Sequence, residues 1–313
     1  MKIQWKYFAY VYLFSCISLP VSAEVNTTQP IKISTWNLEW LTTSPTNSIK
    51  ESQRKAQDFN ALTMKFGQIK PDILAFQEVD SIAAIHKVVG EDYRIYLSDR
   101  AKPQYSNLQF KGVNQYTGFA ISEKWLIRNQ GKIVDPQDIE LLNNAKLRFA
   151  TYIVIQQANR PDLHLLSVHL KHGCAAKKKR SRSCQQLSDQ TDRLNQWLAA
   201  RVEKQQTFIV LGDFNHNLAY QGDWMWQQLT AKLNEKVQLA TQATPAICQV
   251  KSNRNPNQLY RYPSLIDHII VSRPSQVHET QQIAFTKQEA LNYHLSDHCP
   301  VVSDIDFISA NTI

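Results

Sequence analysis

The sequence has little glycine and cysteine, and after residue 23 it has no long hydrophobic run. Its 313 residues include 8 glycines, 12 prolines and 5 cysteines. No stretch is rich in Gly, Pro and Ser and there is no internal repeat, so nothing in the sequence divides the chain into several domains. No segment beyond the N-terminus is long and apolar enough to cross a membrane. The absence of a Cys-x-x-Cys pair argues against zinc.

The composition is that of a globular protein with a large core and a positive charge. Hydrophobic residues make up 43% and aromatic residues 10%, and the formal net charge is +8. A positive protein favours anionic partners, which include nucleic acid, phosphorylated metabolites and acidic lipid headgroups. Composition alone does not choose among these three classes.

The first 23 residues are typical of a signal peptide. Lys2 and Lys6 form a basic start, and an uncharged, largely apolar stretch runs from Tyr7 to Leu19. Small residues before Glu24 predict cleavage near Ala23 and a secreted or periplasmic protein. A second interpretation is lipidation at Cys16, although Phe14 fits such a site poorly.

Four cysteines remain after the predicted cleavage, and an even number in an exported chain indicates two disulfides. Three pairings are possible. We favour Cys174 with Cys184, which closes a short polar loop, and Cys248 with Cys299, which ties a late loop to the candidate site.

Apolar periodicity predicts alternating strands and helices over residues 31–308, after a mobile leader at 24–30. Strands are expected at 31–37, 73–76, 93–97, 116–122, 147–155, 163–170, 207–213, 265–271 and 299–307. Helices are expected at 49–69, 82–89, 185–204 and 224–233, and loops at 99–115, 171–183 and 241–263. This order predicts one α/β domain with mixed sheets.

The stretch from Val210 to His216 ends a buried strand in polar residues. Gly212 would let the backbone bend or approach another chain closely. Asp213 and Asn215 lie two residues apart, so in an extended chain both side chains point to the same side. A carboxylate and an amide would then face one spot from a rigid support.

Similar polar groups follow the other predicted strands, and sites in α/β proteins gather at strand ends. Taken singly, each is more often a turn residue or a hydrogen-bonded histidine, but their recurrence points to one site. They are Asn37, Glu78, His169, Asp213 with Asn215, Asp267 with His268, and Asp297 with His298.

The motifs around these residues resemble those of the endonuclease/exonuclease/phosphatase superfamily of metal-dependent phosphoesterases. The resemblance spans residues 31–305 and implies a DNase I-like fold: a four-layered α/β sandwich in which two mixed β-sheets pack face to face with helices outside. The matching pieces are Thr35-Trp36-Asn37, Gln77-Glu78-Val79, Tyr116-Thr117-Gly118-Phe119-Ala120, Val168-His169-Leu170-Lys171, Gly212-Asp213-Phe214-Asn215, Ile266-Asp267-His268 and Ser296-Asp297-His298.

Phosphodiester hydrolysis suggests a role for each of these residues. Oxygen ligands suit Mg²⁺, with Mn²⁺ as an alternative, and here they would be Asn37, Glu78 and Asp297. Asp213 would activate the attacking water, Asn215 would donate to a phosphoryl oxygen, and Asp267 would orient His298. His169 and His298 would contact other oxygens or assist the leaving group, while Tyr116 and Lys171 would bind the phosphate.

Two departures from family patterns narrow the resemblance. Abasic-site endonucleases have Tyr where this chain has His169, which disfavours that subgroup. Deoxyribonuclease-I-like members have Glu where this chain has Gly118, so the usual carboxylate partner of His169 is missing. The stretch from Gly118 to Ser122 is more similar to sphingomyelinases, phosphatases or other exported bacterial members.

The substrate is less clearly indicated. A basic stretch from Lys177 to Arg182 could bind a phosphate backbone, or it could simply be a solvated loop. The first hypothesis is an exported, monomeric nuclease acting on DNA or RNA. The alternatives are a sphingomyelinase-type phosphodiesterase whose apolar tip could come from Trp224 to Trp226, an enzyme acting on phosphorylated small molecules, and a protein that only binds. Aromatic residues that could stack bases are Tyr105, Phe110, Tyr116, Tyr260 and Tyr262.

Overall fold

The computed structural model describes Met1 and residues 29–307, except for 143–145, 147–148, 159, 175–176, 234, 253 and 256. The predicted signal peptide and most of the predicted leader lie outside the described residues, as does residue 308. Among the described helices, none has the length and apolar character that spanning a bilayer requires.

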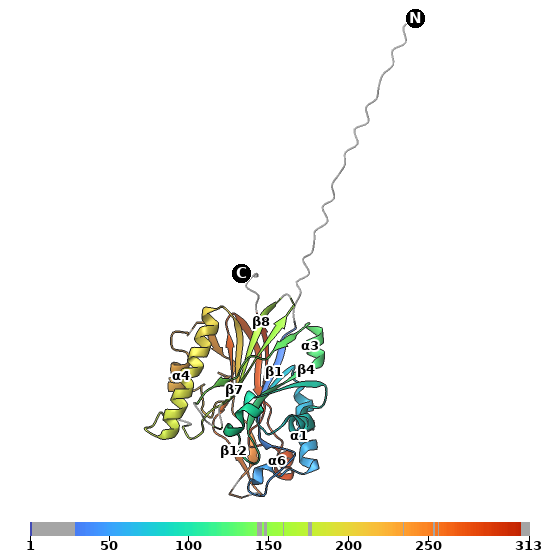
Figure 1. Ribbon diagram of the computed structural model, residues 1–313, viewed down its shortest axis with the longest axis vertical. Coiled ribbons are helices and arrows are strands. Elements are labelled where there is room, and N and C mark those ends of the chain that lie inside the picture. The colour runs from blue at the N-terminus through green and yellow to red at the C-terminus, as the bar shows by residue number, and fades with distance from the viewer. Residues whose placement is uncertain are drawn as a thin grey trace.

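Two mixed β-sheets form the body of the described chain (Figure 1). The first sheet has the strand order β14-β15-β1-β2-β4-β3, and the second has the order β10-β13-β9-β8-β7-β5, with β6 paired to β7. The first sheet consists of β1 (Ile31–Leu41), β2 (Ile73–Val79), β3 (Tyr93–Leu97), β4 (Tyr116–Ser122), β14 (Ser275–Gln282) and β15 (Val301–Phe307). The second consists of β5 (Lys132–Val134), β6 (Ile139–Glu140), β7 (Phe149–Gln157), β8 (Arg160–His169), β9 (Thr207–Asp213), β10 (Val237–Leu239) and β13 (Asp267–Ser272).

Helices cover the outer faces of both sheets, so the expected four-layered α/β sandwich is confirmed. The α-helices are α1 (Ala56–Ile69), α2 (Ile82–Val89), α3 (Glu123–Arg128), α4 (Arg182–Glu203), α5 (Trp224–Leu229) and α6 (Lys287–Asn292). Short 3-10 helices are η1 (Lys50–Ser52), η2 (Asp99–Ala101) and η3 (Pro103–Leu108). A separate hairpin is formed by β11 (Gln249–Lys251) and β12 (Leu259–Arg261).

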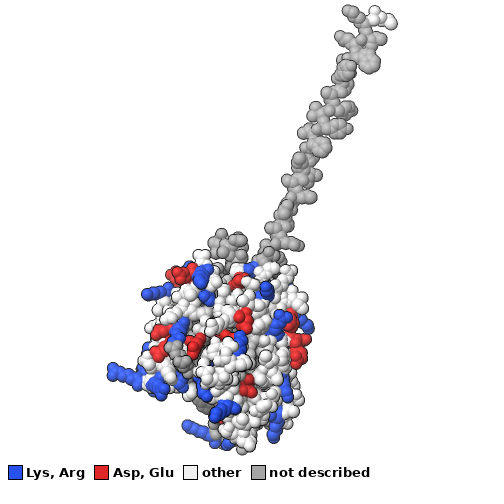
Figure 2. All heavy atoms as spheres, in the orientation of Figure 1, with Lys and Arg blue, Asp and Glu red and all other residues white. Residues whose placement is uncertain are grey.

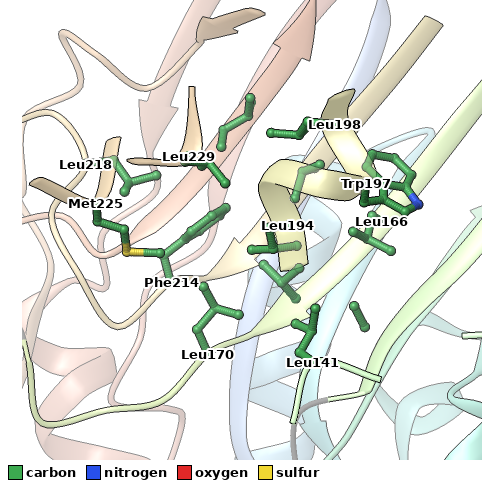
Figure 3. Packing of buried hydrophobic residues seen from close by; sticks show 14 of the residues in the cluster. Leu141, Leu166, Leu170, Leu194, Trp197, Leu198, Phe214, Leu218, Met225 and Leu229 are labelled. Carbon is green, nitrogen blue, oxygen red and sulfur yellow. The ribbon is translucent and has the colours of Figure 1, made fainter. Parts of the chain in front are cut away.

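Three apolar clusters hold these layers together. The cluster between the sheets is rich in β-branched side chains from both, such as Ile33 and Ile73 from the first and Ile209 and Ile269 from the second. A second cluster packs α4 and α5 on the outer face of the second sheet, where Leu194 and Trp197 of α4 face Leu166 of β8 (Figure 3). The third packs α1 and α2 on the first sheet.

Four predicted elements, 82–89, 93–97, 116–122 and 207–213, match the structure at both ends, while others shift or were missed. The helix expected from residue 49 begins at Ala56, where the side chain of Asp58 accepts the backbone N–H of Lys55 and so caps the first turn. The helix expected at 224–233 ends at Leu229. The loop expected at 99–115 contains η2 and η3, and the loop expected at 241–263 contains the β11–β12 hairpin.

Both favoured cysteine pairs are bonded. Cys174 pairs with Cys184 and Cys248 with Cys299, with Cα atoms 5.0 and 5.6 Å apart. These bonds are consistent with an oxidising compartment.

Candidate active site

Three neighbouring strands of the second sheet end in polar side chains that lie opposite one another. In the ladder register, Asp213 of β9 is the partner of His169 on β8 and of Asp267 on β13. All three side chains are buried. Their proximity therefore follows directly from backbone pairing, as expected for strand ends.

Gly212 is required immediately before Asp213. Its φ is +148°, and a Cβ atom there would lie 2.0 Å from the carbonyl oxygen of Val168. Strand β9 therefore approaches β8 at a distance that no side chain permits, which confirms the close approach expected from the sequence.

The first sheet contributes Asn37 and Glu78, and Asn37 links the two sheets. Asn37 Nδ2 donates to Asp213 Oδ2 at 3.1 Å and to Glu78 Oε1 at 3.3 Å. Its amide oxygen accepts the backbone N–H of Glu39 at 3.0 Å. Asn37 therefore lies between two carboxylates as a hydrogen-bond donor, and its role as a metal ligand stays a prediction.

His298 lies between two aspartates. Its Nδ1 is 2.8 Å from Asp267 Oδ2, and its Nε2 is 3.8 Å from Asp213 Oδ2. Burial by itself would lower the pKa of His298, but the carboxylates of Asp267, Asp213 and Asp297 raise it well above its ordinary value. His298 is therefore a cation at neutral pH, with its Nε2–H on the Asp213 side.

Asp213 is a buried carboxylate with several donors. Burial raises its pKa to about 7, and Asp267 adds to this, while His298 and the donors Asn215 and Asn37 oppose it. Its Oδ1 accepts the backbone N–H of Asn215 at 2.7 Å. A carboxyl with a pKa near neutrality is suited to accept a proton from water.

Asn215 faces Asp213, but not through an extended chain as we expected. Asn215 has a φ of +51°, so the backbone turns back after β9. Its Nδ2 donates to Asp213 Oδ2 at 2.9 Å and to the carbonyl oxygen of Leu170 at 3.1 Å. These bonds engage the amide nitrogen, so donation to a phosphoryl oxygen would require an exchange of partners and stays a prediction.

His169 has carboxylates nearby even though Gly118 replaces the usual one. Its Nε2 lies 3.5 Å from Glu78 Oε1 and 3.5 Å from Asp213 Oδ2. A Cβ atom at position 118 would lie 2.2 Å from the ring of Phe76 and 2.5 Å from the carbonyl oxygen of Tyr96. The space that a glutamate would need at position 118 is therefore filled by Phe76.

Three carboxylates, those of Glu39, Glu78 and Asp297, gather on the first-sheet side. Burial raises the pKa of Glu39 to about 8, and Asp297 and Glu78 add to the shift, while Arg54 and His298 oppose it. Burial and Asp297 also raise the pKa of Glu78. Carboxylate oxygens are the hard ligands that Mg²⁺ prefers, and the role of Glu78 and Asp297 as metal ligands stays a prediction.

A second group, Asp213, Asp267 and His298, has ligand atoms within 4.8 Å of one another. Among the described residues, Asp267 Oδ1 is buried and has no hydrogen-bond partner. This group is therefore a second place in the site where a cation could bind.

Two other residues from the sequence patterns, Tyr116 and Lys171, lie apart from these contacts. Tyr116 is buried, and the Arg100 guanidinium lies over its ring at 4.5 Å from the centroid. Lys171 follows the end of β8, with its backbone N–H bonded to Gln190. The phosphate-binding roles of Tyr116 and Lys171 stay predictions.

His268 was wrongly grouped with the site, because successive side chains of a strand point to opposite faces. Its Nδ1 is 2.8 Å from Thr241 Oγ1, and its Nε2 accepts the backbone N–H of Leu218. Burial lowers its pKa to about 3, so it is a neutral core residue.

The sequence patterns did not identify several residues that shape the site. Gln115 donates to Glu78 Oε2. Arg54, fully buried, donates to the carbonyl oxygens of Leu38, His294 and Leu295, and so fixes the segment before Asp297 against the end of β1. Its place in the predicted helix 49–69 gave no signal of this role. Only Glu39 had a signal, because it lies two residues after Asn37.

Comparison with known proteins agrees with this fold. The catalytic domain of human Nocturnin, solved with a bound sulfate anion, is similar with a TM-score of 0.61 and 18% identity, over 89% of this chain and 95% of that one. An endonuclease/exonuclease/phosphatase family protein from Bacteroides thetaiotaomicron is similar with a TM-score of 0.61 and 16% identity, over 90% and 100% of the two chains. The mannosyl-6-phosphatase of the same organism gives 0.59 and 14%, over 88% and 100%.

No curated protein sequence gives a significant match to this chain. A family model does match, and it covers residues 34–298, which include the residues from Asn37 to His298 described above. The chain therefore belongs to the Endonuclease/Exonuclease/phosphatase family, whose members are hydrolases of phosphoester bonds.

Proposed function

We propose that this protein is an exported, divalent-metal-dependent phosphodiesterase that cleaves nucleic acid by attack of an activated water. The observation that carries the proposal is the convergence of Asp213, Asp267 and His298, whose ligand atoms lie within 4.8 Å of one another. Asn37 and Glu78 of the other sheet join this group through hydrogen bonds. A base, a cation and an acidic group at one end of the sandwich are the parts that phosphate hydrolysis needs.

Asp213 is the base in this proposal. Its carboxylate is held by Asn37 and Asn215, so it cannot rotate away from the water it activates. Its raised pKa lets it accept a proton near neutral pH. His298 Nε2 lies 3.8 Å from Asp213 Oδ2, so its cationic ring is close to the carboxylate that accepts the proton.

His298 is the cationic donor. Asp267 binds its Nδ1, which fixes the orientation of the ring and leaves Nε2–H to contact a phosphoryl oxygen or the leaving group. His169, beside Glu78 and Asp213, is placed to contact a second oxygen.

Glu78 and Asp297, together with Glu39, would hold the cation, and Mg²⁺ or Mn²⁺ matches their oxygen ligands. A bound divalent cation would neutralise the anionic phosphate and polarise it for attack. In this arrangement Asn37 would orient the neighbouring carboxylates.

Exposed cations beyond the site support a nucleic-acid substrate. Lys and Arg side chains project on the side of the molecule where Figure 1 places α4 (Figure 2). Cys174, which begins this region, accepts a hydrogen bond from His216, one residue after Asn215. Lys178 is engaged with Ser188 and with the Trp224 ring. Exposed and available for phosphate are Lys177, Lys179, Arg180 and Arg182.

The lipid alternative is weakened by the packing of α5. Met225 is fully buried, and Trp224 packs against His216 with a ring-centroid distance of 5.2 Å. These residues therefore serve the core and do not form an exposed apolar tip.

The decisive experiment is a substrate panel with purified mature protein. Plasmid DNA, RNA, sphingomyelin and 4-nitrophenyl methyl phosphate are each incubated with Mg²⁺, with Mn²⁺ and with EDTA. The proposal expects nicking of plasmid that requires a divalent cation and falls steeply with added salt. Cleavage of sphingomyelin without nicking of plasmid would favour the sphingomyelinase-type alternative. Nicking that does not need a divalent cation would contradict the metal requirement.

A further inference from the structure

A cavity of about 460 Å³ opens beside the acidic part of the site. It reaches the site at Glu39, Ser296 and Asp297, and its other walls come from η1, the β11–β12 hairpin, α6 and the segment before Asp297. Pockets that bind small molecules have volumes of roughly 300 to 1,000 Å³. The cavity is therefore large enough for a ring-sized part of a substrate.

The lining of this cavity is apolar at the bottom and charged at the rim. Val250, Phe285 and Leu295 are buried apolar side chains. Lys50 and Lys251 are exposed, and within the described part of the chain neither ammonium group forms an ion pair. The rim also contains the carboxylate of Glu51 and the imidazole of His294.

The walls are fastened to the site by covalent and buried polar contacts. The disulfide between Cys248 and Cys299 joins the residue before β11 to the residue after His298. Cys248 N–H also donates to Gln282 Oε1 of β14 at 2.8 Å. The cavity therefore has a fixed position relative to His298, as a substrate pocket requires.

The α6 wall is fixed as well. A capping box formed by Thr286 and Glu289 begins this helix, and Lys65 of α1 forms an ion pair with Glu289 at 2.9 Å. The cavity is thus formed in advance of ligand binding on its β11 and α6 sides.

We propose that this cavity is the substrate subsite next to the reacting phosphate, and that it holds a ring, a sugar or nucleoside, that carries a second phosphate facing Lys50 and Lys251. The proposal rests on the phosphoesterase function proposed above and adds a substrate class to it. The apolar bottom accepts one face of the ring, and the two unpaired ammonium groups attract the second phosphate. Such a ring could be the next nucleotide of a nucleic-acid chain or a small sugar bisphosphate.

Steady-state kinetics with matched substrates test this subsite. A dinucleotide with a 5′-phosphate is compared with the same dinucleotide without it, and 4-nitrophenyl methyl phosphate serves as a diester with a single phosphate. In the wild-type protein the 5′-phosphate raises kcat/KM, and in the Lys50→Ala/Lys251→Ala variant this preference falls roughly tenfold, because charge-assisted contacts to phosphate are lost. Turnover of the single-phosphate diester stays within about twofold of wild type.

The control variant, Lys124→Ala/Lys132→Ala, removes the same charge from exposed positions on α3 and β5 and leaves the preference intact. A third variant, Val250→Phe, fills the cavity and raises KM for the dinucleotides; its melting temperature shows whether it is folded. If Val250→Phe does not fold, the lysine variant still decides the matter.

Two results separate the possible failures. Wild-type protein that turns over no phosphoester, the simple diester included, contradicts the proposed function itself. Wild-type protein that is active but indifferent to the 5′-phosphate, or a lysine variant that keeps the preference, overturns the subsite alone. A monosaccharide bisphosphate is tested in parallel to show whether the ring comes from a nucleic acid or from a sugar. The substrate class that the cavity normally binds should lose more kcat/KM in the lysine variant than the other class does.

Discussion

The two sheets bring their polar side chains to the same end of the sandwich by different means. In the second sheet, His169, Asp213 and Asp267 are direct partners in the backbone ladder. In the first sheet, Glu39 and Glu78 have positive φ values of 44° and 58°, outside regular strand geometry. Asp213, the proposed base, and Asp267, the proposed orienting carboxylate, are thus positioned by regular pairing, whereas much of the acidic group depends on irregular backbone and on loop contacts.

This difference suggests which half of the site tolerates change. Ladder pairing is supported along the whole strand, so a single substitution in the second sheet should alter chemistry more than structure. The acidic half relies on Arg54, Ser296 and the disulfide at Cys299, so substitutions there should alter structure and chemistry together. The predictions below test this comparison.

The largest effect is expected for Asp213→Asn. This change keeps the shape of the side chain and removes its ability to accept a proton, so kcat should fall by about 10² to 10⁴, the usual contribution of a general base. The melting temperature should stay close to that of wild type. Asp189→Asn on α4, an exposed carboxylate, is the control and should leave kcat unchanged. Full activity in Asp213→Asn would remove Asp213 from the mechanism.

Arg54→Met tests the acidic half of the site. Arg54 donates to backbone carbonyl oxygens of Leu38, Glu51, His294 and Leu295, and Met leaves these buried acceptors without their donor. The free energy of unfolding should fall by about 3 to 5 kcal/mol, as when a buried charged group is lost. In contrast to Asp213→Asn, the variant should lose both stability and kcat, as measured by urea unfolding and by turnover.

The matched control for Arg54 is Arg94→Ala. Arg94 forms an exposed ion pair with Glu123, so its loss should cost no more than about 1 kcal/mol. If Arg54→Met lowers the free energy of unfolding no more than Arg94→Ala does, the hydrogen bonds by which Arg54 joins β1 to the segment before Asp297 do not contribute to stability.

The two disulfides provide a smaller and internally matched contrast. They close loops with sequence separations of 51 and 10 residues. Loop-closure entropy then predicts that Cys248→Ala/Cys299→Ala costs about 4 kcal/mol and Cys174→Ala/Cys184→Ala about 3 kcal/mol. Only the first pair adjoins His298, so only its loss should also lower kcat. Equal loss of kcat in both double variants would argue against a special role for the Cys299 bond.

The sequence was most informative where regular structure alone decides the outcome. Buried apolar runs located most strands of both sheets, and polar residues at their ends led to Asp213, Asp267 and His169 because ladder partners must converge. Strand β14 was missed because its sequence is largely polar and half of it is exposed at the edge of the first sheet, so it lacks an apolar pattern. A polar strand at the edge of a sheet thus gives a weaker sequence signal than an apolar strand in its interior.

The acidic half of the site, which loops help to position, could be predicted from the sequence only in part. Asn37, Glu78 and Asp297 came from the polar groups at the ends of predicted strands and from motif resemblance. The role of Arg54 depends on carbonyl oxygens of residues more than 200 positions away, a contact that no local pattern encodes. The prediction for His268 was wrong for a local reason. His268 is next to Asp267 in the sequence, so its side chain points to the other face of β13. Strand alternation can therefore predict which face a residue occupies, whereas no local pattern predicts contacts between distant loops.

The smallest effect, and the most specific test of the acidic group, is the pH dependence of stability in Glu39→Gln. In the folded protein the pKa of Glu39 is raised from its ordinary 4.5 to about 8, so folding opposes its ionisation. Below pH 4.5 the carboxyl is neutral in both states and the substitution has no electrostatic effect. As pH rises from 4.5 to about 8, ionisation in the unfolded state destabilises wild type relative to the variant, and above that the difference is constant. Because Glu39 is partly exposed, we expect a gain of about 1 to 3 kcal/mol in the variant at high pH.

Urea unfolding in EDTA at acidic and alkaline pH measures this difference, with the exposed Glu203→Gln as the control. Added Mg²⁺ should then stabilise wild type more than Glu39→Gln at alkaline pH, because a cation among Glu39, Glu78 and Asp297 would offset the burial and the carboxylate repulsion that raise the pKa of Glu39. A stability difference that is the same at both pH values, or that Mg²⁺ does not reduce, would mean that these carboxylates do not act as one cation site.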